Sequence, residues 1–321
     1  MSTAALTLSA CNPGATDQDA AAKPSKSAAP TGVVTRKTAE ATLNRYESVN
    51  NRSNAQRSNT LLSTVEGGQV NLQSAADYRQ WKTWSAADRK QYGSPFFYRD
   101  REWFIPAASS GVHWFAVAAT ATGSTDRAFL VFDKVGATYK LVASLYTDKK
   151  DPLPSIPVDR DGFVTPADPA KAVGDLAPNQ VGAALSDLFA TGGKKTGARL
   201  AATTASTSAR KVYADRGKGK MSGFSTKRFF AKQPVHPEVY ALRLAGGSVL
   251  AVFPSSHTAE TMLKPPYMGS YKINPSDSEA VYNSTGRVVI VDEFQNLGLA
   301  RLNPGGKAEI ITAEYRMVDS R

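Results

Sequence analysis

The chain has 321 residues, of which 41% are hydrophobic and 9% aromatic, so it can bury a sizeable core and exceeds the usual length of one domain. Its formal net charge is +11, and no stretch approaches the roughly 18 apolar residues of a membrane-spanning helix. The single cysteine excludes an intrachain disulfide and a multi-thiolate metal cage, and we expect neither a metal nor a cofactor.

The N-terminal stretch "LSAC", residues 8–11, matches a bacterial lipobox, with an aliphatic residue and two small ones before the lipidated cysteine. Linker composition follows Cys11, and such a segment gives no folded environment that would lower the pKa of a catalytic thiol. The stretch before Cys11 lacks the cationic region of a signal peptide, so an accidental match is the alternative. The prediction is a truncated signal peptide with a lipobox over residues 1–11, lipidation at Cys11, and a disordered tether over residues 12–36.

An N-terminal α+β module is predicted over residues 37–150. Ala39, Leu43, Tyr46 and Val49 form an apolar stripe at helical spacing, and the apolar signal continues to the glycine pair 67–68. The pattern predicts one long, half-buried helix. Three β-branched and aromatic runs separated by short turns then predict an antiparallel meander, over residues 112–122, 126–135 and 138–148.

Nine aromatic residues gather between positions 78 and 104, before the predicted strands. They could line a binding cleft, because aromatic rings supply a large contact area with few rotatable bonds. Closure of the core between helix and sheet is the favoured interpretation. If a cavity exists, its candidate wall residues here are Trp81, Trp84 and Trp103.

A proline-rich linker over residues 151–172 separates the first module from a second one over residues 173–321, because its prolines would break a helix or an interior strand. The second module repeats the order of the first. A helix is predicted within residues 178–193, followed by strands over residues 238–245, 248–257, 286–302 and 307–318. The predicted fold class is α+β, with two tandem modules that each place a helix before a curved, cone-like antiparallel β meander.

A helix packed into a curved antiparallel sheet is the plan of cystatin-like and nuclear-transport-factor-like cone folds. From the lipobox through "NRYESVNNRSN" and "TVEGG" to the closing strands, the chain resembles uncharacterised secreted lipoproteins of actinobacteria. The resemblance implies a membrane-tethered, extracytoplasmic protein and supplies no catalytic residues. Cone folds host enzymes and pure binding modules, so the fold does not decide function.

A basic segment, residues 190–235, carries eleven Lys and Arg against one acid, Asp215, which gives 11 − 1 = +10 of the formal +11. We interpret it as a basic loop that contacts anionic wall polymer or lipid headgroups; a merely solvated loop is the alternative. No nucleic-acid-binding motif is present, so no specific nucleic-acid partner is expected. The candidate anion-binding residues are Lys194, Lys195, Arg210, Lys211, Arg216, Lys218, Lys220, Lys227 and Arg228.

Catalytic motifs are scarce. The stretch "GGKKTG" at residues 192–197 departs from the phosphate-binding loop pattern, and the three histidines stand far apart in the sequence. Asp292 and Glu293 fall within a predicted strand, where alternation directs one of them inward. An inward carboxylate in a cone cavity would have a raised pKa and could act as a base.

Two functional hypotheses follow from the sequence. The first is a non-enzymatic lipoprotein anchored to the outer face of the cell membrane, which binds or scaffolds at the envelope. The alternative is a cone-fold enzyme or small-molecule carrier with a cavity carboxylate. Binding is favoured over catalysis, but the sequence does not decide whether the protein is an enzyme.

Overall fold

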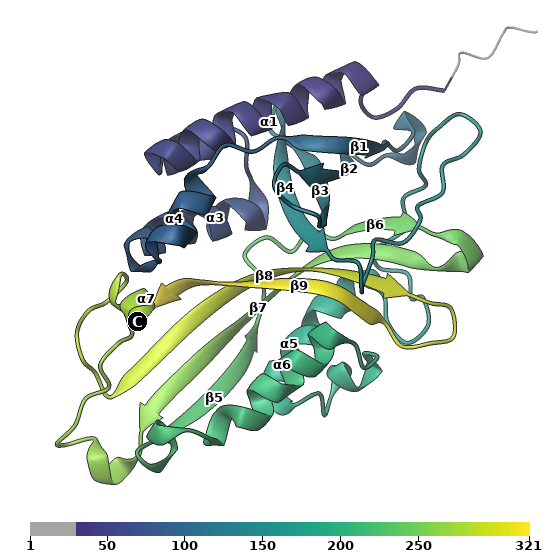
Figure 1. Ribbon diagram of the computed structural model, residues 1–321. Coiled ribbons are helices and arrows are strands. Elements are labelled where there is room, and N and C mark those ends of the chain that lie inside the picture. Colours follow the sequence, from purple (N-terminus) through teal and green to yellow (C-terminus); the bar gives the residue numbers. More distant parts are fainter. Residues whose placement is uncertain (1–29) are drawn as a thin grey trace, which may run out of the picture.

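The structure, a computed structural model, describes residues 30–321, so Cys11 and the lipobox lie outside the described residues (Figure 1). Two antiparallel sheets form its centre, with helices packed on the outside of each. The prediction of an α+β fold with helices before antiparallel strand meanders is confirmed. Among residues 30–321, no helix is both long enough and apolar enough to cross a membrane.

The first helix, α1 (Arg36–Gln56), is shorter than predicted. The Thr35 side chain caps its N-terminus by accepting a hydrogen bond from the Thr38 N–H at 3.1 Å. Arg57, with φ of 53°, adopts the left-handed conformation and ends the helix, so the prediction of one helix reaching the glycine pair 67–68 is wrong. The chain then forms the short helix α2 (Asn59–Leu62), followed by α3 (Gly68–Gln80) and α4 (Ala86–Gly93).

The N-terminal sheet is a meander of four strands in the order β1-β2-β3-β4. The three predicted strands are present, and β1 was not predicted because its charged centre, "RDRE", interrupts the apolar pattern. A change of register between Arg99 and Glu102 takes up that charged stretch. The strands are β1 (Tyr98–Phe104), β2 (Trp114–Ala121), β3 (Arg127–Val135) and β4 (Thr138–Thr147).

The C-terminal sheet has five strands in the order β5-β7-β8-β9, with β6 paired to β7. Helices α5 (Val181–Thr191) and α6 (Thr204–Ala214) cover its outer face (Figure 1), and α7 (Asp277–Ala280) is a single turn. The basic segment is therefore not a loop: it contains α6 and β5, whose charged residues hid the strand pattern. The strands are β5 (Ser225–Lys232), β6 (Tyr240–Arg243), β7 (Val249–Leu263), β8 (Val289–Leu302) and β9 (Glu309–Ser320).

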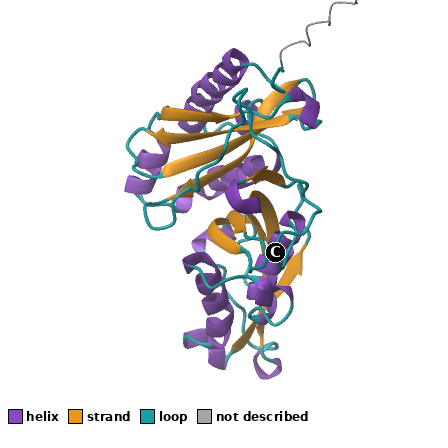
Figure 2. Ribbon diagram, turned by 90° about the vertical axis from the view of Figure 1, so that its right-hand side faces the viewer, coloured by secondary structure: helices purple, strands orange, loops and turns teal. Residues whose placement is uncertain are grey.

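The two sheets pack against each other, with the N-terminal sheet above the C-terminal one (Figure 2). The rings of Trp114 in β2 and Tyr240 in β6 pack edge to face, with their centroids 5.5 Å apart. The Tyr240 hydroxyl donates a hydrogen bond of 2.9 Å to the carboxylate of Asp133 in β3. On the opposite face of the N-terminal sheet, Tyr46 of α1 packs edge to face on Phe132. The layers are thus α1, N-terminal sheet, C-terminal sheet, then α5 and α6, and α3 packs between β4 of the first sheet and β8 and β9 of the second.

The proline-rich segment between the sheets is packed against both of them. The Val164 N–H donates to the Ile105 carbonyl after β1 at 3.1 Å, and the Ala167 N–H donates to Ala241 in β6 at 2.9 Å. Ile156 and Val164 are buried in the shared core. These contacts join the two halves of the chain through a continuous hydrophobic core.

Candidate functional site

A cavity of about 750 Å³ opens in the N-terminal half of the molecule. It lies between the C-terminal half of α1, helices α3 and α4, the end of β4, and β9 of the C-terminal sheet. Its size is within the range of small-molecule sites in proteins. Because β9 supplies part of the wall, the cavity is complete only when both halves of the chain are folded together.

Glu66 is the most buried carboxyl of the cavity wall, with 2% of its surface exposed. Its position is fixed by the hydrogen bond of the next residue, Gly67, to the Leu141 carbonyl of β4 at 2.9 Å. The Oε1 atom lies 3.4 Å from the Tyr46 hydroxyl and 3.5 Å from the Asn50 amide nitrogen. The Oε2 atom has no hydrogen-bond partner among residues 30–321.

Burial raises the pKa of the Glu66 carboxyl from 4.5 to about 8. The nearby Ser74 and Tyr46 hydroxyls and the Asn50 amide act in the opposite direction, and the charge of Asp77 adds to the increase. At neutral pH most of this carboxyl is therefore protonated. A group that supplies a positive charge beside it would favour the ionised form.

A line of polar side chains leads from Glu66 along α1. The Asn50 side-chain amide donates to the Tyr46 hydroxyl at 3.1 Å, and the Asn54 side-chain amide donates to Asn50 Oδ1 at 2.9 Å. The Tyr78 hydroxyl of α3 donates to Asn54 at 2.7 Å. Residues 46, 50 and 54 are four apart and so share one helix face, which is buried. Asparagines at positions where the apolar stripe should continue were the sequence signal for this site, and our sequence analysis missed it.

A second carboxyl group in the wall, Asp77 of α3, pairs with Arg316 of β9 at 3.0 Å. Burial raises its pKa, although the Arg316 guanidinium acts against that change. Glu314, two residues before Arg316, also lines the cavity, and burial raises its pKa as well. Three carboxyls with raised pKa values thus surround one space.

Aromatic rings form the rest of the wall. The ring centroids of Trp84 and Tyr92 are 5.1 Å apart. Trp81 packs against both rings but does not itself line the cavity. Of the three tryptophans expected as wall candidates, the structure places Trp84 in the wall and Trp81 behind it. Trp103 lies elsewhere, in the core between α1 and the sheet, with the Arg36 guanidinium 4.8 Å from its ring.

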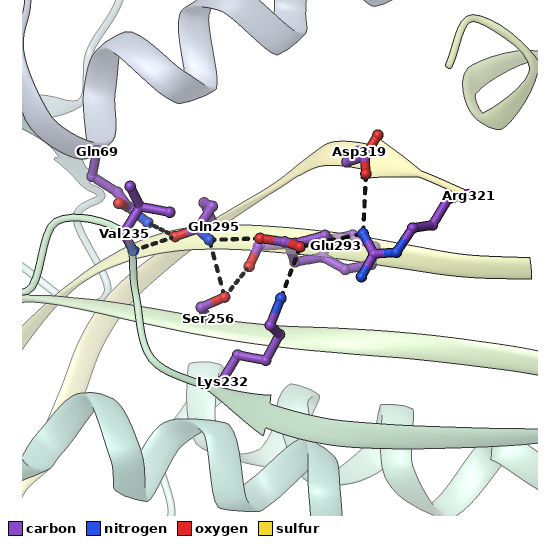
Figure 3. Close-up of polar contacts among 9 residues, drawn as sticks. Gln69, Lys232, Val235, Ser256, Glu293, Gln295, Asp319 and Arg321 are labelled. Atoms are coloured by element: carbon purple, nitrogen blue, oxygen red, sulfur yellow. Dashed lines mark hydrogen bonds and ion pairs between the residues drawn. The ribbon is translucent and has the colours of Figure 1, made fainter. Parts of the chain in front are cut away.

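The carboxylates expected in a cavity, Asp292 and Glu293, lie on β8 and do not line this one. Glu293 pairs with Lys232 at 2.9 Å and Arg321 at 3.6 Å, and it accepts from Gln295 at 3.2 Å (Figure 3). Although partial burial opposes ionisation, these contacts lower the pKa of Glu293 below its usual value. Asp292 is buried, which raises its pKa to about 6. The expected alternation is present, since Asp292 is more deeply buried than Glu293, but neither residue lines the cavity described here.

His257 is a core residue of the C-terminal half. It is 3% exposed and stacks between Phe189 of α5, at 4.3 Å, and Phe294 of β8, at 4.8 Å. Burial lowers its pKa to about 4. His113 is exposed just before β2, so the structure does not bring these histidines together.

The candidate anion-binding residues are spread over the outer side of the C-terminal half. Lys211, Arg216, Lys218 and Lys227 surround one shallow depression between α6 and β5, which also contains Asp215. Lys211 and Lys218 both pair with Asp215, and Arg228 pairs with Glu260 of β7. Because Glu260 lies outside the basic segment, its pairing with Arg228 makes this surface less positive than the sequence count indicates.

The "GGKKTG" turn binds the carboxylate of a residue of the same chain, Asp187. The backbone N–H groups of Lys195 and Gly197 each donate to the Asp187 carboxylate of α5 at 2.9 Å. A turn whose N–H groups are used in this way is not free to bind phosphate. Lys194 and Lys195, which lie in this turn, are both exposed to solvent.

The chemistry of the cavity suits the binding of a polar organic molecule. Its wall combines carboxyls, amides and hydroxyls with aromatic rings. In the part of the chain that the structure describes, no group of three or more His, Cys, Asp or Glu side chains is arranged to hold a metal ion.

Two comparisons place the chain among known sequences. The model of a domain of unknown function, DUF8094, matches residues 30–321. An uncharacterized lipoprotein of Streptomyces coelicolor is 31% identical over an alignment of 224 residues. The alignment covers 67% of this chain and 62% of that protein, so it spans less than two-thirds of the relative. Both findings support the expected family of uncharacterised lipoproteins. Because the family model covers nearly the whole chain, the chain belongs to the DUF8094 family.

Proposed function

We propose that the chain is a lipid-anchored, extracytoplasmic binding protein that holds a small ligand in the cavity of its N-terminal half. The name of the Streptomyces relative and the lipobox at Cys11 support the anchor. The observation that carries the binding role is Glu66, a buried carboxyl in the cavity wall whose Oε2 has no partner among the described residues. An unpartnered buried acceptor costs about 1–3 kcal/mol, which a donor on a ligand would recover.

This function combines the binding hypothesis with a feature of the alternative one, a carboxyl group inside a cavity. The sequence pointed to Asp292 and Glu293, whereas the cavity contains Glu66, Asp77 and Glu314. A carrier needs only a fitted, polar-lined space, and the lining provides one.

The anchor is tested on the full gene product expressed in an actinobacterial host. Intact-mass measurement should show acyl chains on Cys11, and Cys11→Ser should move the protein from the membrane fraction to the soluble one. An unmodified thiol on protein recovered from the cytosol would contradict the anchor.

The cavity is tested by thermal shift against a fixed panel of amines, amino acids and sugars. At least one panel member should raise the Tm of the wild-type protein by several degrees, because a ligand that binds only the folded state stabilises it. Ser144→Leu, which fills the space beside β4, should lose that shift, and Thr122→Trp at the rim should weaken it. Shifts that are absent, or equal in all three proteins, would overturn the proposal.

A second binding surface is supported by the position of the basic depression between α6 and β5. In Figure 1 the first described residues lie at the opposite end of the molecule from β5. If the N-terminus is tethered to the membrane, this end of the molecule is free to reach the cell wall. The partner we propose for this surface is therefore an anionic, phosphate-bearing wall polymer, bound by Lys211, Arg216, Lys218 and Lys227.

Polyglycerol phosphate and vesicles of phosphatidylglycerol are the two arms of the test. Polymer binding should weaken steeply as salt rises, and Lys218→Gln with Lys227→Gln should reduce it. The control pair Lys149→Gln with Lys150→Gln changes the net charge equally on the other half of the molecule. Binding only to vesicles, or equal loss in both pairs, would contradict a polymer site at this surface.

A further inference from the structure

The cavity wall contains more carboxyl than cationic groups, in a protein whose net charge is positive. Four carboxyl groups line it, from Glu66, Asp77, Asp88 and Glu314, whereas Arg316 is the one cationic side chain among the lining residues that the structure describes. The whole chain has a formal net charge of +11. A site with this excess of acid in a basic protein selects against anions and favours cations.

Arg316 does not neutralise Glu66. Its guanidinium is already paired with Asp77 at 3.0 Å. Glu66 accepts two long hydrogen bonds through Oε1, at 3.4 and 3.5 Å. The nearby Ser74 hydroxyl also favours its ionised form, but no donor among residues 30–321 meets hydrogen-bond geometry at Oε2. The carboxyl is 2% exposed, so bulk water does not solvate it freely. A positively charged donor at this position would complete its hydrogen bonds and favour its ionised form.

Aromatic rings lie on the same wall as the carboxyls. Tyr46 and Tyr146 line the cavity near Glu66, and Trp84, Tyr92 and Phe96 line it toward α4. The faces of such rings attract ammonium groups, and an aromatic surround beside a carboxylate is a recurring way to bind quaternary ammonium compounds. The remaining apolar area accommodates a carbon chain attached to the charged group.

From these observations we infer that the ligand of the cavity is an organic cation, an amine or quaternary ammonium compound whose charged group lies against Glu66. The inference rests on the proposed function, since it names the chemical class of the ligand that the cavity holds. A neutral sugar would use the amides and rings, but it has no positive charge that would favour the ionised form of Glu66. An organic anion would meet the excess of carboxyls.

The inference predicts a pH dependence, because the cation requires Glu66 in its ionised form. The titratable and charged groups around Glu66 are Tyr46 of α1, Asp77 and Tyr78 of α3, Tyr92 of α4, Tyr98 of β1, Tyr146 of β4, and Glu314 and Arg316 of β9. Burial raises the pKa values of these tyrosines, so they stay neutral below pH 10. The carboxyls therefore govern binding between pH 6 and pH 9, and a Glu66 variant isolates the part due to Glu66.

The test is calorimetric titration of the full chain with two cations and their neutral isosteres: choline against 3,3-dimethylbutan-1-ol, and butylammonium against butan-1-ol. The cations should bind at least tenfold more tightly than the isosteres. With a pKa near 8, about a tenth of Glu66 is ionised at pH 7 and about nine-tenths at pH 9, so affinity should rise about tenfold between them.

Variants of Glu66 identify the residue responsible. Glu66→Gln should weaken cation binding at least tenfold and remove most of the pH dependence, while Glu66→Asp should retain the pH dependence with weaker binding. Glu40→Gln, on the exposed side of α1, is the matched control and should bind as the wild type does. Circular dichroism confirms that each variant is folded before titration.

The results separate this inference from the proposed function. Equal binding of cations and isosteres, or undiminished cation binding by Glu66→Gln, overturns the inference. If glucose or another neutral panel member binds the wild type but not Ser144→Leu, the cavity function stands and the cation class is wrong. If no probe of either kind binds, both are wrong.

Discussion

The two halves of the molecule use the same plan, a helix on an antiparallel sheet, with opposite results. In the C-terminal half, α5 lies directly on the sheet: a Cβ atom built on Gly182 would be 2.1 Å from the Pro254 carbonyl oxygen of β7. In the N-terminal half, α1 packs closely through Ala39 and Leu43 but borders a cavity farther along.

The composition of the buried helix face explains the difference. The buried residues of α5 are mostly apolar, whereas those of α1 become polar from Glu47 onward, with Asn50 and Asn54 in positions that an apolar residue would otherwise fill. Amides at those positions require partners and cannot pack against an apolar sheet. One half therefore has a filled core that provides support, and the other has a lined space that can hold a ligand.

The largest expected effect is on the free energy of unfolding, at the packed contact between α5 and β7 in the C-terminal half. Gly182→Ala should destabilise the protein by about 3 kcal/mol or prevent folding, because the added methyl group meets backbone that cannot rotate away. Gly217→Ala is the control, since no atom lies within 4 Å of its Cβ position. Urea unfolding followed by circular dichroism measures both. Equal stability of the two variants would show that α5 does not pack this closely.

The next effect is the pH dependence of the free energy of unfolding that Glu66 causes in the cavity wall. The Glu66 carboxyl ionises near 4.5 when unfolded and near 8 when folded, so between these values the folded state holds the extra proton. Its contribution to the free energy of unfolding therefore falls as pH rises through this window, by about 1.4 kcal/mol per pH unit.

Glu66→Gln should remove that decline. Relative to the wild type, its free energy of unfolding should increase by about 3 kcal/mol between pH 5 and pH 8. Asp77 and Glu314 remain in both proteins, so the difference between the two curves isolates Glu66. Parallel curves would contradict the buried, unpartnered state of this carboxyl.

His257, in the C-terminal half, should give the opposite pH dependence: its contribution to the free energy of unfolding should rise with pH. Its pKa falls from 6.5 to about 4 on folding, so the unfolded chain binds the extra proton between these values. Stability due to this group is complete above pH 6.5 and is lost as pH falls toward 4. Denaturant curves at pH 7 and pH 4.5 should therefore show about 2 kcal/mol less loss for His257→Phe than for the wild type. An identical loss would mean that His257 is solvated.

The smallest effect is expected at the surface ion pair between Lys232 and Glu293. Lys232→Gln should cost about 0.5 kcal/mol at low salt and almost nothing in 1 M NaCl, because partly exposed pairs are weak and screened. The Glu66→Gln difference should persist in high salt, since that carboxyl is buried. Thermal unfolding at the two salt concentrations compares them.

The sequence predicted most strands because their β-branched and aromatic runs are unbroken. It missed β1 and β5, whose charged residues face solvent, and it extended α1 past Arg57, where only the backbone conformation ends the helix. The cavity was harder to predict. Glu66 belongs to no regular apolar pattern in the sequence, and its burial depends on contacts with α1, α3 and β4. Trp84 was predicted as a wall candidate because aromatic density is visible in the sequence itself.

The ionisation of Glu66 tests the central claim most directly. Carboxyl ¹³C NMR of the full chain, with the Glu66→Gln variant to assign the resonance, gives the pKa of this group without reference to any ligand. A buried carboxyl with an unpartnered oxygen should titrate near pH 8. Titration near 4.5 would show that Glu66 is solvated or already paired, and the cavity would lose the group around which its ligand is proposed to bind.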